Sequence, residues 1–176
     1  MNVIIKLGVN MFICAQITRI ISFIFEMISA KAKDSKNITL FNGIGNFFLG
    51  VSYLLLNAIT GAICSFIAMI RNYVFYKYKN KLSILVLLLY FIIILGLNYF
   101  EIHNLIDIIP VIIIIIFGTA MYYQNCLGLK LSGIFVSLLE IVYDYYYHSY
   151  IGIIICVLYI ILVVISLYKR NLTLMI

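Results

Sequence analysis

The chain has few charged residues and a single proline. Only 10% of its 176 residues are charged, whereas 66% are hydrophobic, and the mean hydropathy is +1.19. This leaves too little polar surface to coat a water-soluble globule. The composition therefore excludes a soluble domain and identifies lipid as the solvent of this chain.

Residues for metal binding and catalysis are also scarce. The four cysteines form no CxxC pair and three of them lie inside hydrophobic runs, while His103 and His148 have no ligand spacing to each other or to a cysteine. No glycine-rich phosphate loop occurs. We therefore expect no metal, disulfide or cofactor, and we predict that the chain is not an enzyme.

The net charge of +6 is spread over short connections between hydrophobic runs and forms no continuous stripe. A nucleic-acid-binding surface requires such a stripe. We expect no nucleic-acid partner, and the basic residues indicate membrane orientation instead.

Seven hydrophobic runs fill the sequence. A helix rises about 1.5 Å per residue and must cross roughly 30 Å of hydrocarbon, so runs of about 17 to 25 residues predict membrane spans. Backbone amides find no water in lipid, so each run must be helical despite its many Ile and Val residues. The first run carries Arg19 and Glu26 and is interpreted as a mature helix, not a signal peptide. The predicted spans are Val3–Ser29, Ile38–Leu56, Thr60–Tyr76, Leu82–Tyr99, Ile108–Tyr123, Leu131–Tyr147 and Ile151–Tyr168.

Lys and Arg residues in the connections predict the orientation. They fall on one side of the predicted membrane, and only Lys6 breaks the pattern. By the positive-inside rule the amino terminus is outside and the carboxyl terminus is cytoplasmic, which requires an odd number of helices. The residues on this side are Lys31, Lys33, Lys36, Lys77, Lys79, Lys81, Lys130, Lys169 and Arg170.

A faint internal repeat appears when the chain is shifted by 91 residues, which places Gly61 on Gly152 and Asn80 on Asn171. Two three-helix units in the same orientation need one additional crossing between them. The sequence thus predicts an all-α membrane protein in a parallel 3+1+3 arrangement, an architecture known for small transporters. Its parts are a first bundle at 1–81, a linker helix at 82–100 and a second bundle at 101–176.

Polar residues gather on one face of the spans 38–56 and 131–147, as the 100° helical period shows. Asn46 belongs to the first face, Glu140 and Asp144 belong to the second, and Asn72 lies on a polar face of the span 60–76. Such residues either hold membrane helices together or line a solute site. As a site, the predicted lining is Asn46, Asn72, Glu140 and Asp144.

Ionisable residues inside the spans are the sharper signal, because a buried charge costs roughly 2.5 to 3.5 kcal/mol on insertion scales. Glu140 and Asp144 are four residues apart, so we expect Arg19 or Arg71 to neutralise one of them, or one of them to be protonated. Alternatively, Arg71 extends to the cytoplasmic surface. Glu26, two turns from Arg19, is predicted to be a poor partner for it.

Aromatic residues and the proline have simpler interpretations. The tyrosines at 143, 145, 146, 147 and 150 are typical of an aromatic belt at the membrane surface. Pro110 is predicted to lie in the first turn of its helix, where it costs no hydrogen bond.

Short motifs in both halves give a family resemblance. The segments Asn46–Gly50, Asn57–Ala62 and Ile70–Asn72, and then Ile109–Val111 and Ser149–Gly152, resemble those of the YgjV-type bacterial inner membrane proteins. That resemblance implies a relation to the SWEET and PQ-loop carriers, with two three-helix bundles around a central pathway, lined in part by the third helix of each and thus by Asn72.

The chain also departs from that family. Asp144 stands where relatives usually have Asn, and Val163 replaces the polar group that would match Asn72. No Pro-Gln dipeptide or proline in the first span is present to act as a hinge.

These observations predict a multi-pass protein of the bacterial inner (plasma) membrane that carries a small polar or cationic solute between its two bundles. The alternative is a non-transporting membrane protein whose polar faces hold helices together or dock a partner. The expected partners are the lipid bilayer and a small polar solute, with an oligomer left open.

Overall fold

The structure is a computed structural model that describes residues 2–78, 96, 104–123 and 125–174. Within these residues every regular element is a helix, which confirms the predicted all-helical class. The elements are α1 (Asn2–Lys31), α2 (Ser35–Leu55), α3 (Ile59–Tyr78), the 3₁₀ helix η1 (Leu105–Ile108), α5 (Ile109–Tyr123), α6 (Cys126–Tyr146) and α7 (Tyr150–Leu174).

Five of the described helices are long and apolar enough to cross a membrane. They are α1, α2, α3, α6 and α7, whereas η1 and α5 together give a shorter apolar segment, Leu105–Met121. Pro110 lies in the first turn of α5, as the sequence predicted. The predicted span Leu82–Tyr99 lies outside the described residues except for Gly96, so the count of seven spans and the 3+1+3 arrangement stay predictions.

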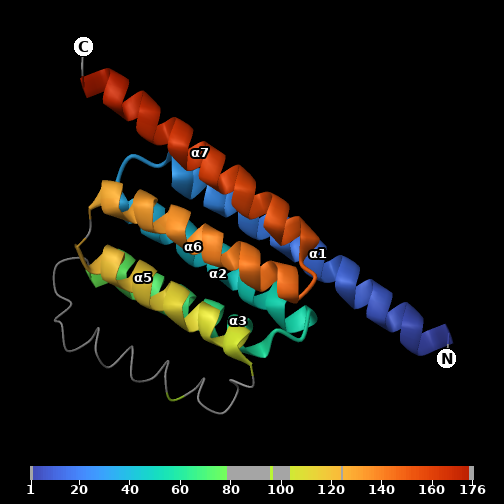
Figure 1. Cartoon of the computed structure of the whole chain (residues 1–176). Helices are drawn as coiled ribbons and strands as arrows, with labels where there is room; N and C mark the ends of the chain where they lie inside the picture. Colours follow the sequence, from blue (N-terminus) through green and yellow to red (C-terminus); the bar gives the residue numbers. More distant parts are fainter. Residues whose placement is uncertain (1, 79–95, 97–103, 124, 175–176) are drawn as a thin grey trace.

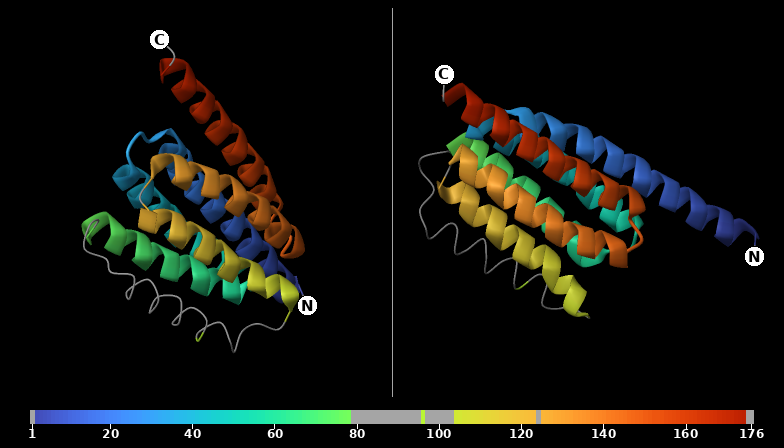
Figure 2. Two further views of the ribbon diagram at one scale, coloured as in Figure 1. Left: turned by 60° about the vertical axis from the view of Figure 1, so that its left-hand side comes forward. Right: turned by 45° about the horizontal axis from the view of Figure 1, so that its top comes forward.

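The six α-helices of the described part close into a ring (Figures 1 and 2). Helix α2 packs between α1 and α3, α6 packs between α5 and α7, and the two sets meet where α1 contacts α7 and α3 contacts α5. Helices α2 and α6 run in the same direction, and the two termini lie at opposite ends of the bundle (Figure 1). The ring therefore consists of two three-helix units with parallel orientation.

The helix boundaries repeat with an offset of 91 residues. Helix α2 occupies 35–55 and α6 occupies 126–146, while α3 begins at 59 and α7 at 150. Each middle helix also begins with a side-chain cap, because Asp34 accepts a hydrogen bond from the Asn37 amide and Asn125 accepts one from the Leu127 amide. The repeat that the sequence suggested is thus present in the backbone.

The turns after α2 and α6 also match. Asn57 and His148 are the non-glycine residues with positive φ in the described part, at 57° and 56°. The Ala58 amide donates to the Tyr53 carbonyl at 2.9 Å, and the Ser149 amide donates to the Asp144 carbonyl at 2.8 Å. Each of these bonds closes a turn that contains one left-handed residue, which is the Schellman motif. The same chain reversal is therefore built twice.

Two equivalent glycines allow α6 to approach α3 and α7. A Cβ atom added at Gly61 would lie 2.7 Å from the Tyr143 hydroxyl, and one added at Gly152 would lie 2.7 Å from Asp144 Cγ. Both distances are below any normal contact, so the absence of a side chain at these positions sets how closely the helices pack.

Replacement of Gly61 or Gly152 by Ala is expected to destabilise the protein by about 1–3 kcal/mol, because the added methyl group overpacks an interface that cannot yield. Thermal unfolding in detergent would show this as a lower midpoint temperature. Gly128→Ala is the matched control, since the nearest described atom to its Cβ would be Asn125 Cβ at 3.7 Å. Equal midpoints for all three variants would show that these close contacts do not limit the packing.

Candidate functional site

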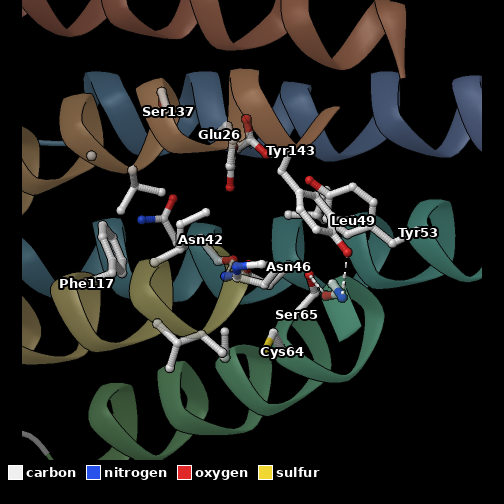
Figure 3. A pocket seen from close by; sticks show the side chains of 18 of the residues that line it. Glu26, Asn42, Asn46, Leu49, Tyr53, Cys64, Ser65, Phe117, Ser137 and Tyr143 are labelled. Carbon is white, nitrogen blue, oxygen red and sulfur yellow. Dashed lines mark hydrogen bonds between the residues drawn. The ribbon is translucent and has the colours of Figure 1, made fainter. Parts of the chain in front are cut away.

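A cavity of about 90 Å³ lies between the two three-helix units. Its lining contains pairs of residues related by the 91-residue offset, so the cavity lies where the two repeat units face each other (Figure 3). These pairs are Glu26 and Phe117, Asn42 and Gly133, Asn46 and Ser137, Leu49 and Glu140, and Ala68 and Tyr159.

Helical periodicity explains which residues face the cavity. Asn42, Asn46, Leu49 and Tyr53 are spaced by three or four residues along α2, so they share one side of that helix. The equivalent spacing on α6 places Gly133, Ser137 and Glu140 on the side of that helix that faces the cavity. The polar faces that the sequence predicted for these two helices therefore meet at one place.

The two halves of the lining differ in chemistry. Helix α2 contributes the amides of Asn42 and Asn46, whereas α6 contributes the Ser137 hydroxyl and the Glu140 carboxylate. Glu26 of α1 adds a second carboxylate that points into the space between the helices (Figure 3). The site is symmetric in position and asymmetric in charge.

Arg19 lies behind these carboxylates and is fully buried. Its Nη2 atom is 3.4 Å from Glu140 Oε2 and 3.3 Å from Asp144 Oδ2, and its Nη1 atom is 3.5 Å from Glu26 Oε1. Arg19 rather than Arg71 is thus the cation against Glu140 and Asp144. The prediction that Glu26 is a poor partner for Arg19 was wrong, because these two long side chains span the two helical turns between them.

Asp144 is fully buried and lies outside the cavity lining. One of its oxygens faces Arg19, and the other accepts a hydrogen bond of 3.0 Å from the Tyr53 hydroxyl. Tyr53 and Asp144 are 91 residues apart and hence occupy equivalent positions in the two units. Equivalent residues can touch only near the axis that relates the units, so this bond marks that axis.

Arg71 does not extend to the cytoplasmic surface, which corrects one of the two predictions for it. It is 5% exposed, and its guanidinium donates to the Asn72 side chain and to the Ile114 carbonyl. Arg71 lines the cavity, whereas Asn72 is fully buried beside it and lies outside the lining. Of the four predicted lining residues, Asn46 and Glu140 therefore reach the cavity, and Asp144 and Asn72 support residues that do.

Tyrosines at the outer end of α6 separate into two groups. Tyr145 and Tyr150 are 71% and 56% exposed, as expected of an interfacial belt. Tyr143, by contrast, is buried, stacks edge-on against Tyr53 at 5.3 Å, and accepts a hydrogen bond from the Gly61 amide (Figure 3). The belt interpretation was wrong for Tyr143, which closes the cavity at this end.

Cys156 is a site residue that the sequence reasoning missed. Its thiol lies 3.4 Å from Glu140 Oε2 and 3.5 Å from Arg19 Nη2. Cys156 lies outside the cavity lining, but the offset of 91 pairs it with Ser65, which does line the cavity, so the repeat itself could have identified it. Among the described residues no group of three or more His, Cys, Asp or Glu side chains has an arrangement that could hold a metal ion.

Comparison with known protein families identifies the chain as a membrane protein. Residues 13–173 match the family model Imp-YgjV, a bacterial inner membrane protein family. No curated protein and no solved structure matches the chain.

Replacement of Arg19 by Met is expected to destabilise the protein by roughly 3–5 kcal/mol, since it leaves buried carboxylates without their cation. The measurement is the unfolding midpoint of the purified protein in detergent. Lys33→Met removes the same charge from an exposed connection and should leave the midpoint unchanged. Adding Asp144→Asn to Arg19→Met should recover part of the loss, and no recovery would contradict the assigned pairing.

Proposed function

Because the chain belongs to the Imp-YgjV family of bacterial inner membrane proteins, we propose that it is an inner-membrane carrier for a small cationic solute. The solute binds in the cavity between the two three-helix units, against Glu26 and Glu140. The membrane location follows from the family and from the length of the apolar helices, and the carrier activity is our proposal.

The observation that carries this proposal is the charge around the cavity. In the described part, Glu26, Glu140 and Asp144 supply three carboxylates, and Arg19 and Arg71 supply two guanidinium groups. An excess negative charge inside a membrane is unfavourable and attracts a cation. Glu26 and Glu140 keep side-chain exposures of 17% and 15%, so a solute in the cavity can reach both.

Acceptor atoms around the cavity suit the donors of an ammonium group. Asn46 Nδ2 donates to the Asn42 carbonyl, and its Oδ1 is a further acceptor beside the carboxylates. A water molecule requires about 10–15 Å³ by this measure of volume, so the cavity holds several waters or one small solute. A short alkylammonium ion fits these limits, whereas a large sugar does not.

The arrangement of the units also favours a carrier. Parallel repeats related by an axis along the membrane normal, with a site at their interface, are characteristic of one class of secondary transporters. We propose that residues 82–100 form the linker helix of a 3+1+3, SWEET-like fold. Rocking of one unit against the other would then expose the cavity to each side in turn.

The rival is a non-transporting scaffold. Asp144 and Asn72 support it, because both are fully buried and both accept hydrogen bonds from neighbouring side chains. Glu26 and Glu140, which remain exposed to the cavity, support the carrier instead. Solute binding distinguishes the two.

Purified protein is expected to be stabilised against thermal unfolding by propylammonium and not by glucose or acetate. Glu140→Gln should weaken the response to propylammonium at least tenfold, or about 1.4 kcal/mol, because it removes a facing charge. Asp34→Asn is the matched control, since it neutralises an exposed carboxylate and keeps a good helix cap. Uptake of propylammonium into proteoliposomes completes the test, and a folded protein that neither binds nor transports it would favour the scaffold.

Orientation is testable separately. In a background without the four native cysteines, a cysteine replacing Lys33 should react with an impermeant maleimide only after the cells are opened. A cysteine replacing His148 should react in intact cells, because the positive-inside rule places that turn outside. The reverse labelling pattern would invert the proposed topology.

A further inference from the structure

We propose that this carrier exchanges one proton for each monovalent cation, and that Glu140 is the proton site. The inference rests on the proposed carrier function and adds how transport is driven.

The charge balance gives the stoichiometry. With all five groups ionised, the described surroundings of the cavity carry three negative and two positive charges, which leaves one negative charge uncompensated. This deficit belongs to the residues themselves, so it must be compensated in both the empty and the loaded state. A proton neutralises it in the empty state and a cation neutralises it in the loaded state, because neither state can keep a net charge in the membrane interior at low cost.

Hydrogen bonding identifies Glu140 as the group that takes the proton. Asp144 receives the Tyr53 hydroxyl at 3.0 Å, and Glu26 receives the Ser22 hydroxyl at 2.8 Å. Glu140 shares Arg19 Nη2 with Asp144, and its one other donor among the described residues is the Cys156 thiol, which is weak. It also lies four residues from Asp144 on the same helix face, where two negative charges repel each other. Glu140 is therefore the least supported carboxylate.

The titratable groups around Glu140 come from five helices, and α5, which also packs against α6, contributes only apolar residues to the cavity lining. Helix α1 contributes Arg19 and Glu26, and α6 contributes Asp144 and Tyr143. Helix α7 contributes Cys156 and Tyr159, and α2 contributes Tyr53. Arg71 of α3 is the second cation, across the cavity.

Donor atoms of Arg19 that make no hydrogen bond, although Nη1 forms an ion pair with Glu26, provide an independent sign of a ligand. Arg19 is fully buried, yet its Nε and Nη1 atoms make no hydrogen bond to any described residue. Buried donors are normally satisfied, so such atoms indicate a water or a ligand in the functional state. Nη1 lies 3.5 Å from Glu26, and Glu26 in turn lines the cavity, so these donors lie behind a carboxylate that a ligand can reach.

The exchange step is simple. As the ammonium ion enters, the O–H bond of the Glu140 carboxylic acid breaks and the proton passes to water in the cavity. The carboxylate that remains accepts a hydrogen bond from the ammonium group. One positive charge leaves as one arrives, so the cycle moves no net charge and a pH gradient, rather than the membrane potential, drives it.

The test is titration calorimetry of the purified full-length protein with propylammonium, in two buffers that differ in ionisation enthalpy. The ligand keeps its own proton between pH 6 and pH 8, as a lysine side chain does, so any released proton comes from the protein. We expect about one proton released per ion bound, and an apparent Kd that rises about tenfold for each unit fall in pH while the empty site is protonated. Glu140→Gln should release none and bind independently of pH.

Each outcome of this test decides the matter. Binding without proton release by the wild-type protein overturns the exchange and leaves the proposed carrier intact, whereas no binding by folded protein overturns both. Release by Glu140→Gln equal to that of the wild type removes Glu140 from its role. Asp34→Asn, which lacks a carboxylate far from the cavity, should release as many protons as the wild type. The wild-type titration alone decides the proton stoichiometry even if the Glu140 variant does not fold.

Discussion

The pairing of one buried guanidinium with three carboxylates constrains this whole molecule. Arg19 is withdrawn from solvent in the middle of a membrane-length helix, where an unpaired charge is costly. Its partners come from its own helix and from α6, and the Asp144 among them is bonded in turn to Tyr53 of α2. One ionic cluster therefore fixes how the first three-helix unit sits against the second.

Duplication explains why the cluster has this composition. At the position where the two units meet, one copy carries Tyr53 and the other carries Asp144. Two aspartates there would repel each other, and two tyrosines would leave the Arg19 guanidinium without that carboxylate. The two copies have diverged into a donor and an acceptor that complement each other. Because equivalent residues touch at the shared axis, they must differ in chemistry, and the site is therefore asymmetric. The same divergence leaves amides on the α2 side of the cavity and a carboxylate on the α6 side.

Sequence reasoning could predict the features that depend on local pattern. Hydrophobic length gave the helices of the described part, and the 91-residue offset anticipated the matching starts of α2 and α6. Helical spacing also gave the faces that carry Asn46 and Glu140. Helical spacing could not give the rotation of one helix against another. One interpretation therefore placed Arg71 at the cytoplasmic surface and Tyr143 at the lipid boundary, although both are buried. Nor could it give the reach of two long side chains, which is why Glu26 was predicted to be a poor partner for Arg19.

Members of the same cluster differ in their access to the cavity. Asp144 is fully buried at the axis, where Tyr53 binds it, whereas Glu26 and Glu140 face the cavity with part of their surface open. Arg19 serves both groups, but its two terminal nitrogens must be divided among three carboxylates. The carboxylate that shares its nitrogen and gains no hydroxyl donor is left partly unsatisfied. That residue is Glu140, so the arrangement that locks the two halves together also leaves one acidic group in the cavity ready for a proton or a cation.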